Sequence, residues 1–288
     1  MKSKILVLVA VFVLLASGCV GQEEGDVIKQ ILRIDVVAGG VEDIHIRAEV
    51  PEFARPNRNF TWHILATPSI DISDFDFFVY DRCGELFIPV GDDSFHEDSI
   101  RANRTKTYEI KYTLKETQVN SCKVRFKTTY TSNMTMSQNI VVLDEFEWME
   151  RENRGTRKDI PVYTYSSTNP LRMEISFSHD QPLIEEAEVR MYIDYYDDGT
   201  GIISELGPGD VKIEVPGNLE FITCDDYKME DNMLVLDKEK KFFNKKAVRS
   251  TCEFNTLAEQ VIDTRTMFIE ALYGYSLDNE FTVSILRL

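Results

Sequence analysis

The sequence predicts an all-β protein that folds into two tandem β-sandwich domains behind an N-terminal export signal. Three observations support this prediction. Most of the chain alternates apolar and polar residues, four cysteines divide into two pairs, and a short apolar run precedes a fifth cysteine near the N-terminus. The chain has 288 residues, of which 43% are hydrophobic. It is therefore long enough for two ordinary domains and apolar enough to exclude wholesale disorder.

The N-terminus has the features of a targeting signal. Lys2 and Lys4 form a positively charged region that precedes an apolar run from Ile5 to Ala16. At about 1.5 Å per residue this run spans about 18 Å, short of a hydrocarbon core of roughly 30 Å, and it has the length of the apolar region of a secretory signal peptide. The sequence Leu15-Ala16-Ser17-Gly18-Cys19 that follows resembles the lipobox of prokaryotic lipoproteins.

This resemblance implies that residues 1–18 are a lipoprotein signal peptide and that Cys19 is lipidated and becomes the mature N-terminus. Residues 19–28 would then form a tether. The expected location is extracytoplasmic, with the lipid anchor in the outer face of the cell membrane. An uncleaved N-terminal anchor is the alternative, and it places the protein on the same side of the membrane.

The charge balance excludes one large class of partners. The chain carries 32 Lys+Arg against 49 Asp+Glu, a net charge of -17 at pH 7. Nucleic-acid binding needs a surplus of basic residues on one face, so no nucleic-acid partner is expected. The acidic surface favours solubility and disfavours close contact with anionic lipid headgroups.

Cysteine usage agrees with an exported protein. With Cys19 used for lipid, Cys83, Cys122, Cys224 and Cys252 remain, and in an oxidising compartment they are expected to form disulfides. Four cysteines allow three connectivities. The pairs Cys83–Cys122 and Cys224–Cys252 are favoured because each lies within one predicted domain. Zinc is disfavoured because neither a CxxC nor a CxxxH spacing occurs.

Period-two alternation identifies the strands. The clearest stretches are residues 43–50, 107–112, 123–126, 171–177, 189–193, 211–215 and 281–285. Runs of this kind between turn residues indicate antiparallel strands with one wet face. Glu145 to Arg157, with clustered charge and Gly155 near its end, is the one segment expected to be helical or irregular. The predicted domains are therefore residues 29–145 and 161–288, joined by a linker at 146–160.

The two halves follow one plan. Each has a strand flanked by proline, a strand that ends at a cysteine, a second cysteine, a strand that contains Tyr130 or Tyr273, and a final strand of alternating aliphatic residues. This order fits a pair of immunoglobulin-like sandwiches. Together with the lipobox and Leu272-Tyr273-Gly274-Tyr275 before the last strand, it resembles archaeal cell-surface lipoproteins built from immunoglobulin-like domains. The resemblance implies an envelope location and a scaffold, and it transfers no functional residue.

The chain lacks the local patterns of common catalytic sites. Its four histidines are scattered, and no GxSxG elbow, P-loop or HExxH pattern occurs. A non-catalytic protein is therefore expected. The acidic stretch that contains Asp194, Asp197 and Asp198 could bind Ca²⁺, but it lacks the EF-hand spacing, and a solvated turn is favoured. No other cofactor is expected.

Surface features suggest modification and contact. Asn59, Asn103 and Asn133 begin N-x-[ST] triplets and are possible glycosylation sites. The basic segment 238–246 is either a docking surface for an acidic partner or a hairpin with charged flanks, and the hairpin is favoured. Trp62 is expected in the core of the first sandwich.

The leading functional hypothesis is a non-catalytic, membrane-anchored envelope lipoprotein that acts as a surface scaffold or interaction protein. The first alternative is a subunit that binds a glycan, a peptide or a partner protein through loops at one end of a sandwich. A cryptic or Ca²⁺-dependent hydrolase is the third and weakest hypothesis.

Overall fold

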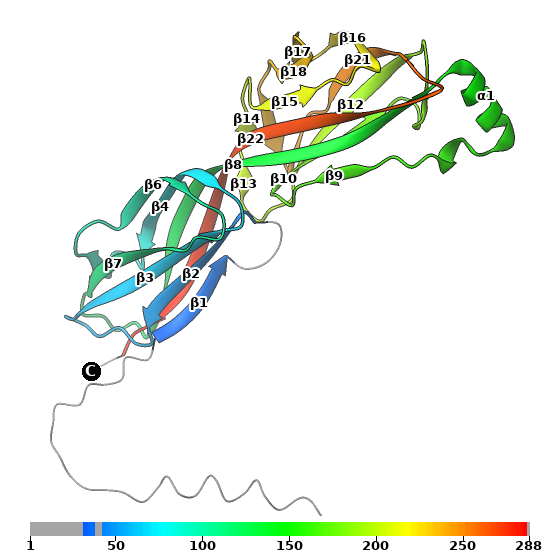
Figure 1. The fold of residues 1–288 in the computed structure, drawn as a ribbon. Helices are drawn as coiled ribbons and strands as arrows, with labels where there is room; N and C mark the ends of the chain where they lie inside the picture. The colour runs from blue at the N-terminus through cyan, green and yellow to red at the C-terminus, as the bar shows by residue number, and fades with distance from the viewer. Residues whose placement is uncertain (1–30, 38–41, 287–288) are drawn as a thin grey trace, which may run out of the picture. The chain divides into compact units, whose positions relative to one another are not determined.

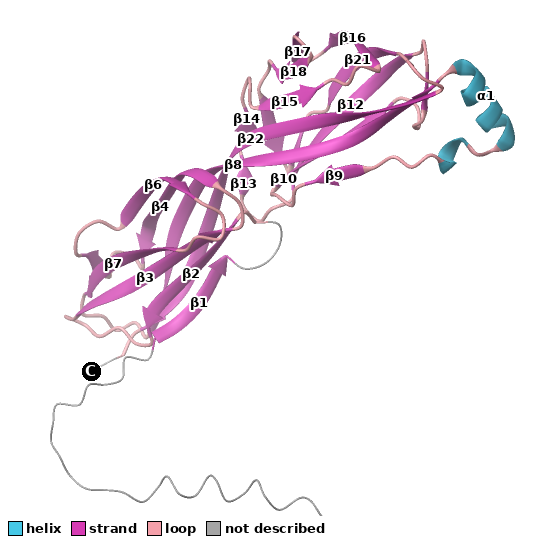
Figure 2. Cartoon of the chain, viewed as in Figure 1, coloured by secondary structure: helices cyan, strands magenta, loops and turns pink. Residues whose placement is uncertain are grey.

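The computed structural model describes residues 31–37 and 42–286 (Figure 1). The prediction of an all-β protein is confirmed, because strands dominate these residues and the sheets are antiparallel apart from a two-residue parallel pairing (Figure 2). The predicted signal peptide, the predicted lipidation site Cys19 and the predicted tether lie outside the described residues.

The alternation that predicts strands also decides which side chains are buried. In β2 (Ile44–Pro51) every second residue is buried, from Ile44 to Val50, while His45, Arg47 and Glu49 are only partly covered. Successive side chains of a strand point to opposite faces of a sheet, so the apolar set of each strand packs inward. The predicted strands at 43–50, 107–112, 171–177 and 189–193 agree with observed strands to within a few residues.

One sheet has five strands in the order β1-β2-β3-β7-β5. With β2 given above, its other strands are β1 (Ile31–Val37), β3 (Asn59–Pro68), β5 (Phe87–Pro89) and β7 (Lys106–Leu114).

A second sheet has ten strands, and its main order is β17-β18-β15-β22-β8-β4-β6, with β9 and β11 beside β8 and β13 beside β22. These strands are β4 (Ile72–Arg82), β6 (Ser94–Ile100), β8 (Ser121–Leu143), β9 (Thr164–Ser166), β11 (Leu183–Ile184), β13 (Ile202–Ile203), β15 (Val211–Glu214), β17 (Tyr227–Glu230), β18 (Met233–Leu236) and β22 (Ile262–Ser284).

The third sheet has seven strands, in the order β14-β19-β20-β12-β21-β16, with β10 paired to β12. These strands are β10 (Leu171–Phe177), β12 (Glu188–Asp197), β14 (Glu205–Leu206), β16 (Leu219–Cys224), β19 (Lys240–Phe243), β20 (Lys246–Ala247) and β21 (Ser250–Thr256).

The strands β8 and β22 form a ribbon that belongs to two sandwich-like lobes. They pair antiparallel along their full length, from Leu143 opposite Ile262 to Ser121 opposite Ser284. In the first lobe the five-stranded sheet faces β4, β6 and the end of the ribbon that contains Phe281. In the second lobe the seven-stranded sheet faces β15, β17, β18 and the rest of the ribbon (Figure 1).

Contacts across the facing sheets build both cores. In the first lobe the Trp62 ring on β3 meets the Phe281 ring on β22, with 5.1 Å between centroids. In the second lobe the hydroxyl groups of Tyr195 on β12 and Tyr227 on β17 lie 2.7 Å apart. Trp62 is fully buried, as the sequence predicts.

The expected division of the chain at residues 146–160 does not separate two domains. The described residues all fall in one compact unit that begins at Ile31. Both halves of the chain enter both lobes, because β8 runs from the first lobe into the second and β22 runs back. The period-two pattern reveals a strand but not which sheet each end of that strand joins, so the boundary drawn by residue number is corrected.

The segment expected to be helical or irregular contains α1 (Glu145–Arg154) and the short 3-10 helix η1 (Arg157–Asp159). Asp144 caps α1 by accepting a hydrogen bond from the Glu147 amide at 2.6 Å, and Gly155 ends it in the left-handed conformation, with φ 67°. No helix in residues 31–37 or 42–286 has the length and apolar character needed to span a membrane.

Candidate binding site

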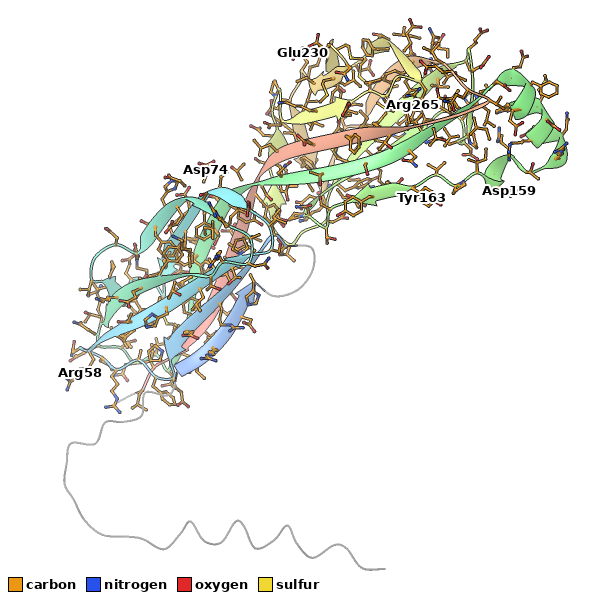
Figure 3. All side chains as sticks on the ribbon, viewed as in Figure 1. Arg58, Asp74, Asp159, Tyr163, Glu230 and Arg265 are labelled. Carbon is orange, nitrogen blue, oxygen red and sulfur yellow. A yellow bond between two sulfur atoms is a disulfide. The ribbon has the colours of Figure 1, made fainter. Side chains whose placement is uncertain are left out.

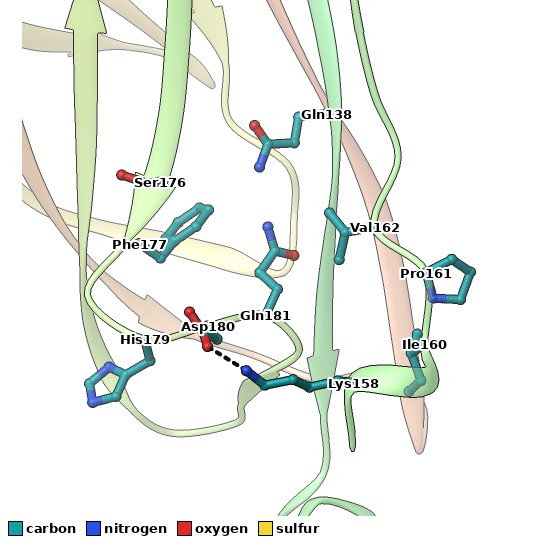
Figure 4. Close-up of a pocket in the computed structure, with 10 residues that line it drawn as sticks. All are labelled: Gln138, Lys158, Ile160, Pro161, Val162, Ser176, Phe177, His179, Asp180 and Gln181. Atoms are coloured by element: carbon teal, nitrogen blue, oxygen red, sulfur yellow. Dashed lines mark hydrogen bonds and ion pairs between the residues drawn. The ribbon is translucent and has the colours of Figure 1, made fainter. Parts of the chain in front are cut away.

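A pocket with a volume of about 460 Å³ opens at one edge of the second lobe (Figure 4). It lies between β8, the end of β10 and the segment 158–162 that returns from α1. Gln138 and Gln181 contribute amide groups, and Phe177 and Val162 contribute apolar surface. This volume and this mixture of side chains fall within the range of small-ligand sites.

Two interactions hold the loop after β10 beside the pocket. The Gln181 side chain accepts a hydrogen bond from the Val141 backbone amide at 2.9 Å, which joins the loop to β8. The Lys158 ammonium group lies 3.0 Å from the Asp180 carboxylate, and both side chains are exposed. An exposed ion pair of this kind contributes little stability, so we assign the fixed position of the loop mainly to Gln181.

The imidazole of His179, which lines the pocket, lies beside the hydroxyl group of its neighbour Ser178. Ser178 Oγ lies 3.1 Å from His179 Nδ1. Nucleophilic catalysis needs a base that is itself oriented by a third group, as a carboxylate orients histidine in a triad. Asp180 is paired with Lys158, and within the described part of the chain no carboxylate contacts His179. The arrangement suits hydrogen bonding to a ligand better than proton transfer.

A pair of aromatic residues, here called the aromatic platform, lies on the outer face of the ten-stranded sheet. Tyr165 on β9 and Phe268 on β22 are both register partners of Ser137 on β8, so only that small side chain separates them. They are 68% and 52% exposed. Neighbouring strands are about 4.8 Å apart, which places the two rings roughly 10 Å from each other. Tyr163, two residues before Tyr165, is also exposed (Figure 3).

Asp197, one of the predicted metal ligands, instead holds a lysine. The Lys245 ammonium group lies 3.1 Å from Asp197 Oδ2 and donates hydrogen bonds to the backbone oxygens of Gly199 and Gly201, each at 2.6 Å. Burial raises the pKa of Asp197, and the bond from Lys245 opposes that shift. The ammonium group occupies the position that a metal ion would need.

The other two predicted ligands have different arginine partners, Arg249 in the loop before β21 and Arg172 on β10. Arg249 makes two hydrogen bonds to Asp194, at 2.9 and 2.7 Å, and Arg172 donates to Asp198 at 2.5 Å. The structure therefore does not bring Asp194, Asp197 and Asp198 together. In a strand, side chains at neighbouring positions point to opposite faces, so proximity in sequence did not imply a shared site.

Both predicted disulfides are present. Cys83 is joined to Cys122 with 5.7 Å between Cα atoms, and Cys224 to Cys252 with 4.0 Å. Cys224 and Cys252 are register partners on β16 and β21, and Cys122 lies on β8 beside the end of β4. Each disulfide thus joins neighbouring strands of one sheet.

The three possible glycosylation sites differ in their backbone setting, although all three asparagines are exposed. Asn103 lies in a turn with φ 57°, Asn59 begins β3 and accepts a hydrogen bond from Thr113 at 2.5 Å, and Asn133 lies in the middle of β8.

The basic segment 238–246 contains the hairpin of β19 and β20, which turns at Asn244 and Lys245, both with positive φ.

Sequence reasoning missed the pocket and the aromatic platform. A signal for the platform exists in Met267-Phe268-Ile269, where apolar residues occupy both faces of a strand. Met267 and Ile269 are buried, so Phe268 is left on the outer face. The pocket has no comparable signal, because its residues come from three separate segments.

No protein-family model matches the chain, and no curated protein matches it. Three of the solved structures with some likeness are a Danio rerio Fcho1 Mu homology domain with bound Eps15 peptide, the C-terminal globular domain of an oligosaccharyltransferase from Pyrococcus abyssi, and the secreted serine protease VesC from Vibrio cholerae. Their identities are 8%, 11% and 9%, and their TM-scores are 0.23, 0.22 and 0.19. The matches cover 52%, 83% and 77% of this chain, and 83%, 46% and 48% of the respective structures. TM-scores this low assign neither a shared fold nor a function.

Proposed function

We propose that the protein is a non-catalytic envelope lipoprotein, anchored through Cys19 outside the cell membrane, that binds a partner through the aromatic platform. The observation that carries this proposal is the exposure of Tyr165 and Phe268 on one face of a sheet, with Ser137 between them. Exposed aromatic residues grouped on a rigid surface are typical of interaction sites.

The sequence and the fold support the proposed location and scaffold. The lipobox-like sequence that ends at Cys19 supports the anchor, and two disulfides suit an oxidising compartment. We retain immunoglobulin-like sandwiches as part of the proposal, supported by the facing antiparallel sheets. The disulfides depart from the immunoglobulin pattern, because they join strands of the same sheet rather than two facing sheets.

The platform is built to bind without rearrangement. Its backbone belongs to β8, β9 and β22, and β8 lies inside the ten-stranded sheet. A side chain on such a scaffold loses little backbone freedom when a partner docks, so more of the contact energy is retained as affinity. Tyr165 and Phe268 can cover the apolar C–H face of a sugar ring or an apolar side chain of a partner protein.

A second candidate function is the binding of a small polar ligand, and the pocket of about 460 Å³ is the observation that favours it. Gln138 and His179 supply hydrogen-bonding groups, and Phe177 supplies an apolar wall. Under this function His179→Ala would weaken ligand binding, while changes in the aromatic platform would leave it unchanged.

Site-specific photocrosslinking in intact envelopes tests the proposed function. Tyr165 or Phe268 is replaced by p-benzoylphenylalanine, and Phe243, which is 69% exposed on β19, provides the matched control position. We expect positions 165 and 268 to yield an adduct of the same defined mass, and position 243 to lack it. The proposal also requires that Phe268→Ser lower the adduct yield from position 165 at least several-fold.

Two results would contradict the proposed function. One is equal labelling from all three positions, which would indicate random encounters. The other is the absence of any adduct from positions 165 and 268 in a correctly anchored protein. An adduct at the pocket lining alone, for example from position 177, would favour the second candidate.

A further inference from the structure

Polar side chains gather in the core where the β8–β22 ribbon passes from the first lobe to the second. The group, here called the junction cluster, consists of Glu42, Asp43, Tyr130, Ser132, Asn169 and Tyr273. Apolar side chains flank it along the ribbon, with Phe126 on the first-lobe side and Met134 on the second-lobe side, both fully buried. The cluster is therefore a polar layer between two apolar cores.

Asp43 is a fully buried carboxyl group without a basic partner. Its side chain accepts hydrogen bonds from Tyr273 OH at 2.5 Å and from Asn169 Nδ2 at 3.0 Å. Its neighbour Glu42 accepts hydrogen bonds through Oε1 from Thr200 Oγ1, at 2.6 Å, and from Tyr275 OH, at 3.3 Å. In the ranges that the structure describes, no lysine, arginine or histidine forms an ion pair with either carboxyl group.

Three buried oxygens around these two acids have no hydrogen-bond partner in the described residues: Glu42 Oε2, Tyr130 OH and Asn169 Oδ1. The Ser132 hydroxyl group interacts with Asp43 and lowers the pKa of that carboxyl group. Tyr130, Ser132 and Asn169 are each at least nine-tenths buried. Polar groups in a protein core are almost always satisfied, so this concentration of unsatisfied oxygens points to a bound species.

The residues of the cluster occupy neighbouring positions around Asp43. Ser132 is the register partner of Tyr273, whose hydroxyl group bonds Asp43, and it lies close enough to influence the pKa of Asp43. Tyr130 lies two positions before Ser132 along β8, on the same inward face and beside Tyr275. The side-chain amide of Asn169 already donates a hydrogen bond to Asp43. Rotating this amide group by 180° exchanges the positions of its nitrogen and oxygen atoms.

We propose that the junction cluster binds a calcium ion, with the carboxylates of Glu42 and Asp43 as charged ligands and the oxygens of Asn169, Ser132 and Tyr130 as neutral ligands. All candidate donors are oxygen atoms, which suits a hard cation and disfavours zinc. Ca²⁺ accepts six to eight oxygens in irregular geometry, whereas Mg²⁺ requires a compact octahedron. Two carboxylates balance the charge of one divalent ion.

A proton is the competing occupant. Burial raises the pKa of Asp43, as expected for a carboxyl group that lacks a cation. A protonated Asp43 could donate to one of the neighbouring oxygens. A proton on Asp43 would still leave Glu42 Oε2 and Tyr130 OH without a partner. A cation bound among these oxygens would coordinate several of them at once.

A calcium ion at this position would connect the two lobes. Glu42 and Asp43 directly precede β2 of the five-stranded sheet, and Asn169 lies just before β10 of the seven-stranded sheet. Tyr130, Ser132 and Tyr273 belong to the shared ribbon. The ion would thus join one segment of each lobe to the strands common to both, and its loss would weaken the junction.

Terbium luminescence on the disulfide-bonded protein tests this proposal. Tb³⁺ replaces Ca²⁺ in oxygen sites and emits when a nearby tyrosine is excited, and Tyr130 and Tyr273 lie in the cluster. We expect saturable emission that Ca²⁺ displaces and Mg²⁺ does not. Glu42→Gln combined with Asp43→Asn should reduce the emission at least tenfold. The matched control is Asp194→Asn combined with Asp198→Asn, which should leave it unchanged.

A second measurement covers the possibility that the double variant does not fold. Ser132→Ala and Tyr130→Phe remove one neutral oxygen each and keep both carboxyl groups, so they should fold and bind Tb³⁺ several-fold more weakly. In the wild type, Ca²⁺ at about 100 times its Kd should raise the Tm by roughly 5 °C. Emission that persists in the Glu42/Asp43 variant, or a wild type with neither Tb³⁺ emission nor a Tm shift, would overturn the proposal and leave water or a proton in the cluster.

Discussion

The indole of Trp62 packs edge-on against the ring of Phe281, with 5.1 Å between centroids and 81° between planes. Trp62 lies on β3, among the first strands of the chain, and Phe281 lies near the end of the last strand. The core of the first lobe is therefore completed only when the C-terminal end of the chain is in place. Formation of this lobe depends on contacts between segments that are far apart in sequence.

Phe281→Ala tests this dependence. Phe281 is 3% exposed and contacts Trp62 and Phe126, so its truncation should lower the free energy of unfolding by about 3–5 kcal/mol. Urea denaturation followed by tryptophan fluorescence measures the change. Phe268→Ala in the same strand is the control, because Phe268 is 52% exposed, and it should cost less than about 1 kcal/mol. Equal losses in the two variants would contradict the assigned packing.

The two disulfides should contribute similar stabilities. They close loops of 39 and 28 residues, for which the chain-entropy model gives about 4 kcal/mol for Cys83–Cys122 and about 3.5 kcal/mol for Cys224–Cys252. Paired Cys→Ser variants in urea denaturation measure each contribution. Peptide mapping without reductant should find these two linkages, and a linkage between Cys83 or Cys122 and either of the other cysteines would refute the pairing.

The stability of the metal-free protein should depend on Asp43 through pH. Because burial raises the pKa of Asp43, the folded state binds this proton more tightly than the unfolded chain. The stabilisation is complete below the ordinary value of 3.8 and is lost as pH rises through the folded-state pKa. In chelator, the wild type should therefore lose stability relative to Asp43→Asn as pH rises.

Urea denaturation of both proteins at several pH values in chelator measures this difference. The titratable groups that face Asp43 are Glu42, Tyr130 and Tyr273, and they are common to both proteins. A difference that stays constant with pH would mean that Asp43 does not titrate differently in the folded state. Saturating Ca²⁺ should suppress the loss, because the ion stabilises the charged form.

Lys245 should stabilise the turn that contains Asp197. The Asp197 side chain is 3% exposed, and Lys245 supplies its positive partner. Lys245→Met should lower the free energy of unfolding by about 2 kcal/mol, because a buried carboxyl group loses its charged hydrogen-bond donor. The expected loss of stability is modest because Lys245 is 46% exposed, and water screens its attraction to Asp197. The control, Lys212→Met on the exposed face of β15, should change stability by less than about 0.5 kcal/mol.

Cys19 should determine membrane association. If Cys19 carries lipid, Cys19→Ser should release the protein from membranes or leave the signal peptide uncleaved. Stable anchoring requires two hydrocarbon chains, because one chain alone gives only marginal affinity. Membrane fractionation and the intact mass of the mature protein measure the result. An unmodified Cys19 in membrane-bound mature protein would exclude the lipid anchor.

Local pattern was sufficient for the strands and for the cysteine pairs. Alternation in residues 44–50 predicts the buried face of β2, because side chains of a strand point alternately to its two sides. Gly155 and the charged residues before it predict a helical or irregular segment, and α1 occupies most of it. The observed cysteine pairs are those favoured because each lies within one predicted domain. Cys224 and Cys252 are register partners on neighbouring strands, and Cys83 directly follows β4 beside Cys122 on β8.

The sequence by itself determined that this protein consists of strands and which face of most strands is apolar, because these properties depend on neighbouring residues, and it favoured the cysteine pairs that the structure contains. Only the tertiary structure decided that β22 serves both lobes, that Asp43 lies beside Tyr273, and that Phe268 faces outward opposite Ser137. Each of these depends on the partner and register of a distant strand. The alternation of apolar and polar residues within a strand is the same whichever strand pairs with it. The alternation therefore does not reveal the identity of the neighbouring strand or the register of the pairing.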